Sequence, residues 1–177
     1  MVSGNANQSN YALNLDGDSG VLTLNHPSNT FGGGTKNAVR INNNTILSIA
    51  ANGSLGDPAN FLLHTGGSGG ILLQRAFNVT RNVQVTGNAT SVFDTNGFDS
   101  TLAGSLTGSP TLNSRFSKRG TGRLIYQGSG DLMAGGIRVE GGTLTLPPAA
   151  SLSQAGTDPA LGIRGGAALE IAGGSLG

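Results

Sequence analysis

Eight short stretches of this chain share one pattern, in which two apolar residues flank a single polar one. Successive side chains of a β-strand point to opposite faces, so each triplet predicts a very short strand that buries two residues and exposes one. The eight triplets are Leu13-Asn14-Leu15, Leu22-Thr23-Leu24, Val39-Arg40-Ile41, Leu47-Ser48-Ile49, Val83-Gln84-Val85, Ile137-Arg138-Val139, Leu144-Thr145-Leu146 and Leu169-Glu170-Ile171.

Glycine and small polar residues separate the triplets, as in Gly17-Asp18-Ser19-Gly20 and Asn42-Asn43-Asn44. The chain has 177 residues, of which 31 are Gly and none is Cys. Short strands between tight turns, without a helical pattern, predict an all-β fold and favour a single-chain β-solenoid. At roughly 20 residues per coil, the solenoid would have about eight or nine coils. A sandwich or jelly roll, the rival architecture, would favour strands of about five to six residues.

The triplets, together with the imperfect version Leu124-Ile125-Tyr126, also predict which side chains form one continuous, column-like core. The inward positions are Leu22, Leu24, Val39, Ile41, Leu47, Ile49, Val83, Val85, Leu124, Ile137, Val139, Leu144, Leu146, Leu169 and Ile171. The outward positions are Thr23, Arg40, Ser48, Gln84, Arg138, Thr145 and Glu170.

Four pairs of segments recur in the same order at an offset of roughly 100 residues, which predicts a repeated unit several coils long. The pairs are Gly20–Leu24 with Gly122–Tyr126, Gly33-Gly34 with Gly135-Gly136, Val39–Ile41 with Ile137–Val139, and Asp57–Ala59 with Asp158–Ala160. We therefore expect a first β-helix repeat unit over residues 17–121 and a second, truncated unit over 122–177. Residues 1–16 would form an N-terminal cap or a vector-derived start. Leu22 and Leu124 should then occupy equivalent places in their coils.

Two segments in the second half carry a family resemblance. They are Phe116-Ser117-Lys118-Arg119-Gly120-Thr121-Gly122-Arg123-Leu124-Ile125-Tyr126-Gln127-Gly128 and Gly135-Gly136-Ile137-Arg138-Val139-Glu140-Gly141-Gly142-Thr143-Leu144. They resemble the passenger-associated (autotransporter-associated) β-strand repeat, whose loose pattern is Leu-x-Lys-x-Gly-x-Gly-x-Leu-x-Leu-x-Gly followed by Gly-Gly-Thr-x-Val-x-x-Gly-Thr-Leu. The sequence departs from that pattern at Ile137, where the family has Thr. In looser form the resemblance extends from Gly17 to Leu176.

The resemblance implies a right-handed, single-stranded parallel β-helix from a passenger of the type V secretion route. It implies a bacterial cell-surface, extracellular location, with a tether to an outer-membrane β-barrel of the same parent chain. The chain would then be a piece of a longer protein, a non-enzymatic stalk or adhesin segment that aids folding and export. Expected partners are host or neighbouring-cell surface glycans or proteins, together with end-to-end self-association, and no nucleic acid.

Candidate chemistry is sparse, and we assign no catalytic, cofactor-binding or metal residues and no cofactor. Asp94 and Asp99 could form a carboxylate pair across a turn, as glycosidases require, but Asp is also a common turn residue, and the turn role is favoured. His26 and His64 are isolated and predicted to be surface or turn residues. A carbohydrate-active β-helix enzyme and a self-stacking, fibre-forming module remain as alternatives.

Charged residues give two further expectations. Arg115, Lys118, Arg119 and Arg123 form the densest basic cluster, which we predict to be a solvated edge of the solenoid. A net charge of +1 gives no general attraction to nucleic acid. A calcium loop beginning at Asp16 would place Pro27 where the loop needs a bidentate Glu, so calcium binding is not expected.

Overall fold

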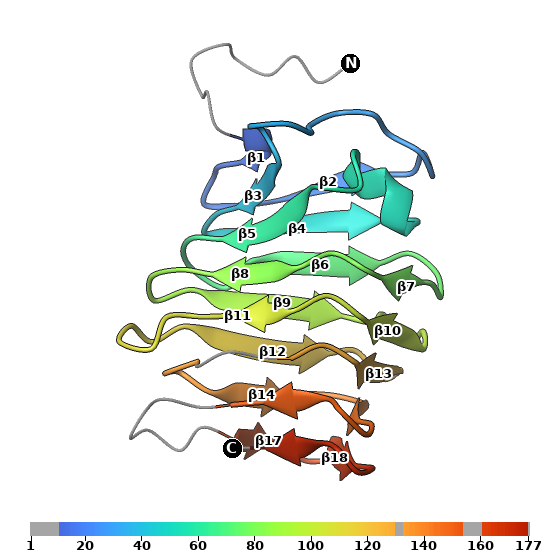
Figure 1. The fold of residues 1–177 in the computed structure, drawn as a ribbon, viewed down its shortest axis with the longest axis vertical. Helices are drawn as coiled ribbons and strands as arrows, with labels where there is room; N and C mark the ends of the chain where they lie inside the picture. Colours follow the sequence, from blue (N-terminus) through green and yellow to red (C-terminus); the bar gives the residue numbers. More distant parts are fainter. Residues whose placement is uncertain (1–10, 130–132, 154–160, 177) are drawn as a thin grey trace.

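The computed structural model describes residues 11–129, 133–153 and 161–176, which coil into a parallel β-solenoid (Figure 1). All pairings between its named strands are parallel, and each strand pairs with the equivalent strand of the next coil. Backbone hydrogen bonds therefore run along the long axis, and the predicted all-β, parallel solenoid is confirmed. No helix among the described residues is long and apolar enough to cross a membrane.

Three sheets form the faces of the solenoid. The first sheet contains β1 (Tyr11–Leu15), β3 (Ala38–Ile41), β5 (Phe61–His64), β8 (Val83–Val85) and β11 (Leu106–Thr107). The second contains β2 (Ser19–Leu24), β4 (Asn44–Ile49), β6 (Gly70–Leu73), β9 (Thr90–Asp94), β12 (Arg115–Arg119), β14 (Ile137–Val139) and β17 (Leu161–Ile163). The third contains β7 (Asn78–Val79), β10 (Ser100–Leu102), β13 (Arg123–Tyr126), β15 (Thr143–Leu146) and β18 (Ala168–Ile171).

A fourth, two-stranded sheet joins β16 (Ser151–Leu152) to β19 (Ser175–Leu176). Along the chain, β16 and β19 each follow a strand of the third sheet. In earlier coils the strand that follows the third sheet belongs to the first sheet, so β16 and β19 occupy the equivalent position. A parallel bridge between Ser129 and Ser151 extends this face by one further coil.

The number of coils differs from the prediction. The second sheet has seven strands, so the chain completes about six turns between β2 and β17. The expected eight or nine coils are wrong because the real coils are longer than assumed. Leu22 pairs with Leu47, 25 residues further on, and Lys118 pairs with Val139, 21 residues further on.

All eight triplets lie within strands, and most of their inward residues form the predicted core. Four inward residues are less covered because they belong to terminal coils, which have a neighbour on one side only. Leu22, Leu24 and Leu169 are half-buried, and Ile171 is 52% exposed. The buried members are Val39, Ile41, Leu47, Ile49, Val83, Val85, Leu124, Ile137, Val139, Leu144 and Leu146.

Two of the predicted outward residues are buried instead of exposed. Thr145 donates a 2.9 Å hydrogen bond from Oγ1 to Oε2 of Glu170, the outward residue of the next coil, which covers it. Ser48 lies between Thr23 and Leu72 in one outward row, and its neighbours shield it. Thr23, Gln84 and Glu170 are exposed as predicted, whereas Arg40 and Arg138 are half-buried.

The expected equivalence of segments about 100 residues apart is wrong. Leu22 lies in β2 of the second sheet, whereas Leu124 lies in β13 of the third. Val39–Ile41 lies in the first sheet, and its supposed counterpart Ile137–Val139 lies in the second. Strands of every face share the same alternation, so short matches arise between faces that are not equivalent. The second of the two Asp-Pro pairs, Asp158-Pro159, falls outside the described residues.

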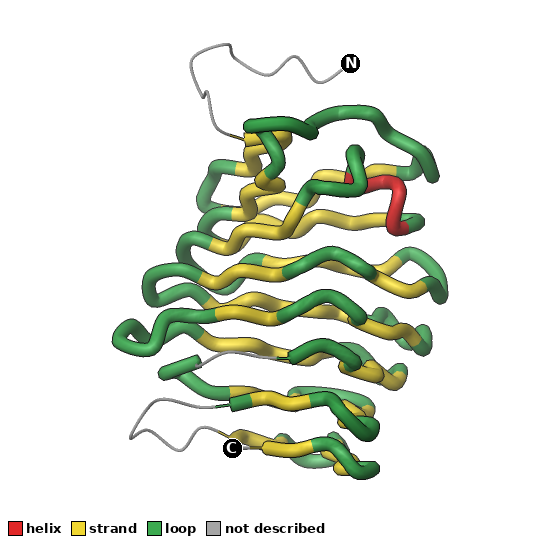
Figure 2. The backbone as a smooth tube through the Cα atoms, in the orientation of Figure 1, coloured by secondary structure: helices red, strands yellow, loops and turns green. Residues whose placement is uncertain are grey.

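The N-terminal end carries its own cover. The segment of residues 25–37 crosses the end of the solenoid (blue in Figure 1), and a 3₁₀ turn, η1 (Asn52–Leu55), takes the place of a third-sheet strand in the second coil (Figure 2). Asn60 Nδ2 joins the two by donating to the carbonyl oxygens of Phe31 at 2.9 Å and Leu55 at 2.8 Å. Arg81 then donates from below to the carbonyl oxygen of Gly56 at 3.0 Å.

Candidate functional site

A lysine lies in the inward row of the second sheet. Lys118 pairs with Phe93 on one side and Val139 on the other, and its side chain is completely buried. Its Nζ donates to Thr95 Oγ1 at 3.0 Å and to the carbonyl oxygens of Arg119 at 2.8 Å, Gly120 at 2.6 Å and Gly141 at 3.0 Å. Four oxygens from three successive coils therefore surround one ammonium group.

Burial lowers the pKa of Lys118 to about 8, and the carboxylates of Asp94 and Asp99 act in the opposite direction. The ammonium is enclosed and fully hydrogen-bonded, so its chemistry is that of a structural cation. A nucleophilic or Schiff-base lysine needs access for its substrate, and Lys118 has none.

Two glycines of the same segment explain its spacing. Gly120 has φ +76°, a conformation that favours glycine, and this turn aims its carbonyl at Lys118. A Cβ at Gly122 would collide with the carbonyl of Phe98 in the preceding coil. The Lys-x-Gly-x-Gly spacing thus builds one tight corner of the solenoid.

The two aspartates do not share a common role. Asp94 Oδ1 accepts a 2.8 Å hydrogen bond from the backbone N–H of Asn96, which is the turn role that the sequence favours. Asp99 Oδ1 accepts a 2.7 Å bond from the N–H of Arg123, 24 residues later, and so ties two coils together. The sequence pattern gives no sign of this second contact.

One of the two histidines is a core residue. His64 ends β5, lies between Ile41 and Val85 in an inward row, and is buried. Burial lowers its pKa to about 4, and its Nδ1 has no hydrogen-bond partner among the residues that the structure describes. The prediction of a surface or turn position is therefore wrong for His64 but correct for His26, which lies in an exposed loop.

The basic cluster is the predicted solvated edge only in part, since Arg123 is exposed and Arg115 and Arg119 are half-buried. Lys118 is buried, and Arg119 Nε pairs with Glu140 Oε2 at 2.7 Å. Arg164, one coil further on, lies 3.7 Å from the other oxygen of Glu140, so charges of alternating sign follow the long axis. Arg123 pairs with Glu170 at 3.4 Å.

Metal-ligating side chains do not gather in the part of the chain that the structure describes, where no group of three or more His, Cys, Asp or Glu residues could hold an ion. Asp16, the supposed start of a calcium loop, accepts a 2.7 Å hydrogen bond from Asn42 Nδ2 and lies 3.3 Å from Arg40. Both contacts lower the pKa of Asp16.

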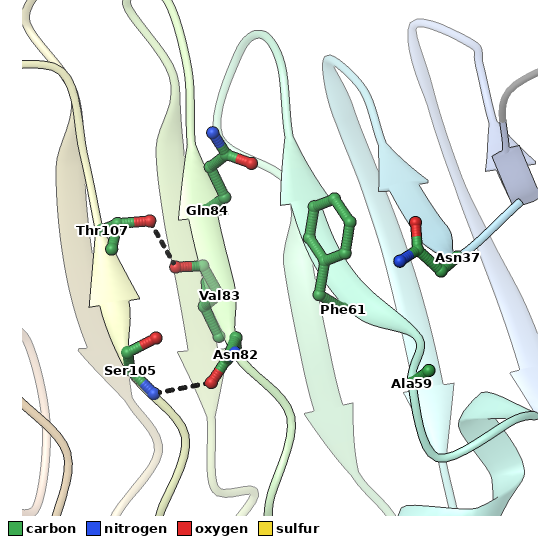
Figure 3. Close-up of a pocket in the computed structure, with 8 residues that line it drawn as sticks. All are labelled: Asn37, Ala59, Phe61, Asn82, Val83, Gln84, Ser105 and Thr107. Carbon is green, nitrogen blue, oxygen red and sulfur yellow. Dashed lines mark hydrogen bonds between the residues drawn. The ribbon is translucent and has the colours of Figure 1, made fainter. Parts of the chain in front are cut away.

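A shallow groove of about 430 Å³ lies on the outer face of the first sheet (Figure 3). The Phe61 ring projects from β5 between the side-chain amides of Gln84 and Asn37. Asn82, Ser105 and Thr107 line the side nearer β11. Sequence reasoning missed this groove because its residues come from four coils, and only the outward aromatic at position 61 could have drawn attention to it.

No protein-family model matches the chain, and searches of curated proteins and of solved structures returned no significant match. The function is therefore inferred from the residues and their geometry.

Proposed function

We propose that this chain is a non-enzymatic structural and adhesive segment of a bacterial autotransporter passenger, displayed outside the cell through an outer-membrane β-barrel of its parent protein. In this role the solenoid extends a surface stalk and aids folding and export. The proposal includes a right-handed coil, which is the hand that parallel crossover connections almost always take.

The single observation that carries the proposal is the arrangement around Lys118. The residues that resemble the passenger-associated repeat are the ones that join successive coils, since Lys118 Nζ binds the carbonyl of Gly120 in the first half-motif and that of Gly141 in the second. The two halves also pair in register, with Phe116 opposite Ile137. The residues of the repeat pattern therefore make the contacts that hold one coil on the next in this chain.

The geometry of the charged groups supports a structural role over hydrolysis. Glycosidases need one carboxylate to act as an acid and another to act as a base or nucleophile. Asp94 and Asp99 each accept a backbone hydrogen bond, and both act on the buried Lys118. Asp94 stabilises a turn, and Asp99 links two successive coils.

Surface display tests the proposal directly. The chain would be fused to the outer-membrane barrel of an unrelated autotransporter in a Gram-negative host, and intact cells would be treated with proteinase K. We expect cleavage of the fusion without lysis. An inaccessible fusion, in cells that display the same barrel with a short reference passenger, would contradict the proposal.

Exposed apolar residues at the C-terminal end favour a second candidate function, end-to-end self-association. Ile163 is 49% exposed and Ile171 is 52% exposed, and both lie in edge strands of their sheets. A second copy could cover them and add a strand to each edge. Sedimentation velocity at rising concentration tests this candidate: growing species that the Ile163→Glu variant abolishes would support it, and a concentration-independent monomer would exclude it.

A further inference from the structure

We propose that the groove over β5, β8 and β11 binds a neutral oligosaccharide. This inference rests on the adhesive role proposed above and names the class of partner and the residues that contact it.

The apolar part of the groove is the face of Phe61. This residue is half-buried at the start of β5, so its ring is held against the sheet yet reachable from solvent. Pyranose rings have apolar C–H faces that pack on an aromatic ring, and aromatic side chains provide large, rigid contact surfaces. Phe61 therefore offers a platform for one sugar unit.

The polar part consists of groups that can both donate and accept hydrogen bonds. Within the described residues, the side-chain amides of Gln84 and Asn37 make no hydrogen bond to the protein, and they stand on either side of Phe61. Asn82 Oδ1 already accepts from the N–H of Ser105 at 3.0 Å, which leaves its NH₂ group without a hydrogen-bond partner among the described residues. Amides of this kind match sugar hydroxyls, which are donors and acceptors at once.

The charge of the groove selects among ligands. None of its lining residues is charged, whereas nucleic acids and acidic polysaccharides are recognised mainly through Lys and Arg. An extended peptide would bind by adding a strand to a free sheet edge. β11 is the end strand of the sheet, but β5 and β8, which carry Phe61 and Gln84, are paired on both sides and offer a ligand their side chains and no free edge.

The groove is also preformed. Its residues lie on or beside strands spaced about 4.8 Å apart along the axis, and neighbouring coils fix their positions. Little conformational entropy is lost when a ligand binds to such a surface, which compensates for a shallow shape. Many copies displayed on one cell would add avidity to a weak single site.

Titration of the ¹⁵N-labelled chain with neutral hexasaccharides tests the inference. Maltohexaose, cellohexaose and chitohexaose are the probes, with oligogalacturonate as the anionic comparison. We expect backbone shifts confined to β5, β8 and β11 with at least one neutral probe. Phe61→Ala and Gln84→Ala should each weaken that binding at least tenfold, whereas Phe61→Tyr and the third-sheet control Thr101→Ala should retain it.

Absence of groove shifts with every neutral probe at millimolar concentration would overturn the inference. Binding of oligogalacturonate alone, or shifts that persist in the Phe61→Ala variant, would overturn it as well. The titration uses the isolated chain and involves no export step, so its failure is distinguishable from failure of the surface-display experiment.

Discussion

Lys118 Nζ lies 3.0 Å from Oγ1 of Thr95, a residue of the preceding coil, inside the largely apolar column of the solenoid. The cost of removing this charge from water is offset by four oxygen acceptors, three of which are backbone carbonyls.

The first prediction follows from removing this cation. Lys118→Met should lower the free energy of unfolding by about 3 kcal/mol, because buried carbonyls lose their donor. Urea denaturation measures the loss.

Lys36→Met is the matched control, since Lys36 is exposed in the loop of residues 25–37. Its unfolding midpoint should stay close to that of the native sequence. Equal midpoints for the Lys118 and Lys36 variants would show that the buried ammonium does not hold the coils together.

The second prediction concerns acid stability and His64. Burial lowers the pKa of His64 from 6.5 to about 4, so the unfolded chain binds more protons than the folded chain between these values. Stability should therefore fall as the pH decreases through this window, by about 3 kcal/mol in total for this residue. Urea unfolding at a series of pH values would show a flatter profile for His64→Leu.

The exposed His26 provides the comparison for that profile. His26→Gln should keep the acid dependence of the native sequence because it leaves His64 in place. A His64→Leu profile that runs parallel to the native one would contradict the prediction.

The third prediction contrasts the two faces of β13. Leu124 is completely buried and pairs with Leu144, whereas its neighbour Ile125 is half-buried on the opposite face. Leu124→Asp should unfold the adjoining coils, because an unpaired carboxylate in an apolar column costs about 5 kcal/mol or more. Ile125→Asp should retain the fold. Circular dichroism and limited proteolysis separate the two outcomes, and equal tolerance would disprove the assigned faces.

The fourth prediction tests the non-enzymatic role. Replacing Asp94 and Asp99 together by Asn keeps an acceptor oxygen at both positions, so the backbone bonds to Asn96 and Arg123 can persist. We expect an intact fold, a loss of about 1 kcal/mol from the weaker, uncharged hydrogen bonds, and unchanged surface binding. A polysaccharide-cleavage screen should find no activity in either protein. Cleavage by the native chain that disappears in a folded double variant would identify an enzyme.

The alternating triplets were enough to predict short strands and most of the core, because a period of two is a local property of a strand. Parallel stacking was implied by the resemblance to the passenger-associated repeat. Strands with polar or small inward residues escaped that pattern. Lys118 in β12 and His64 in β5 stand where an apolar residue was expected, and the sequence cannot show which partners make a buried polar group tolerable. The number of coils also escaped it, since turn lengths vary from coil to coil.

The sequence by itself determined that the chain forms short strands of alternating polarity, and hence an all-β fold in which a solenoid is favoured over a sandwich. Tertiary structure alone decided which strand belongs to which face, since Leu22 and Leu124 carry the same local pattern on different sheets. The tertiary structure also formed the groove, which is lined by Phe61 and Gln84 from adjacent coils although 23 positions separate these residues in the sequence. The alternation of polar and apolar residues shows whether each side chain of a strand points inward or outward. Which residues become neighbours in adjacent coils depends on the summed length of all strands and turns between them.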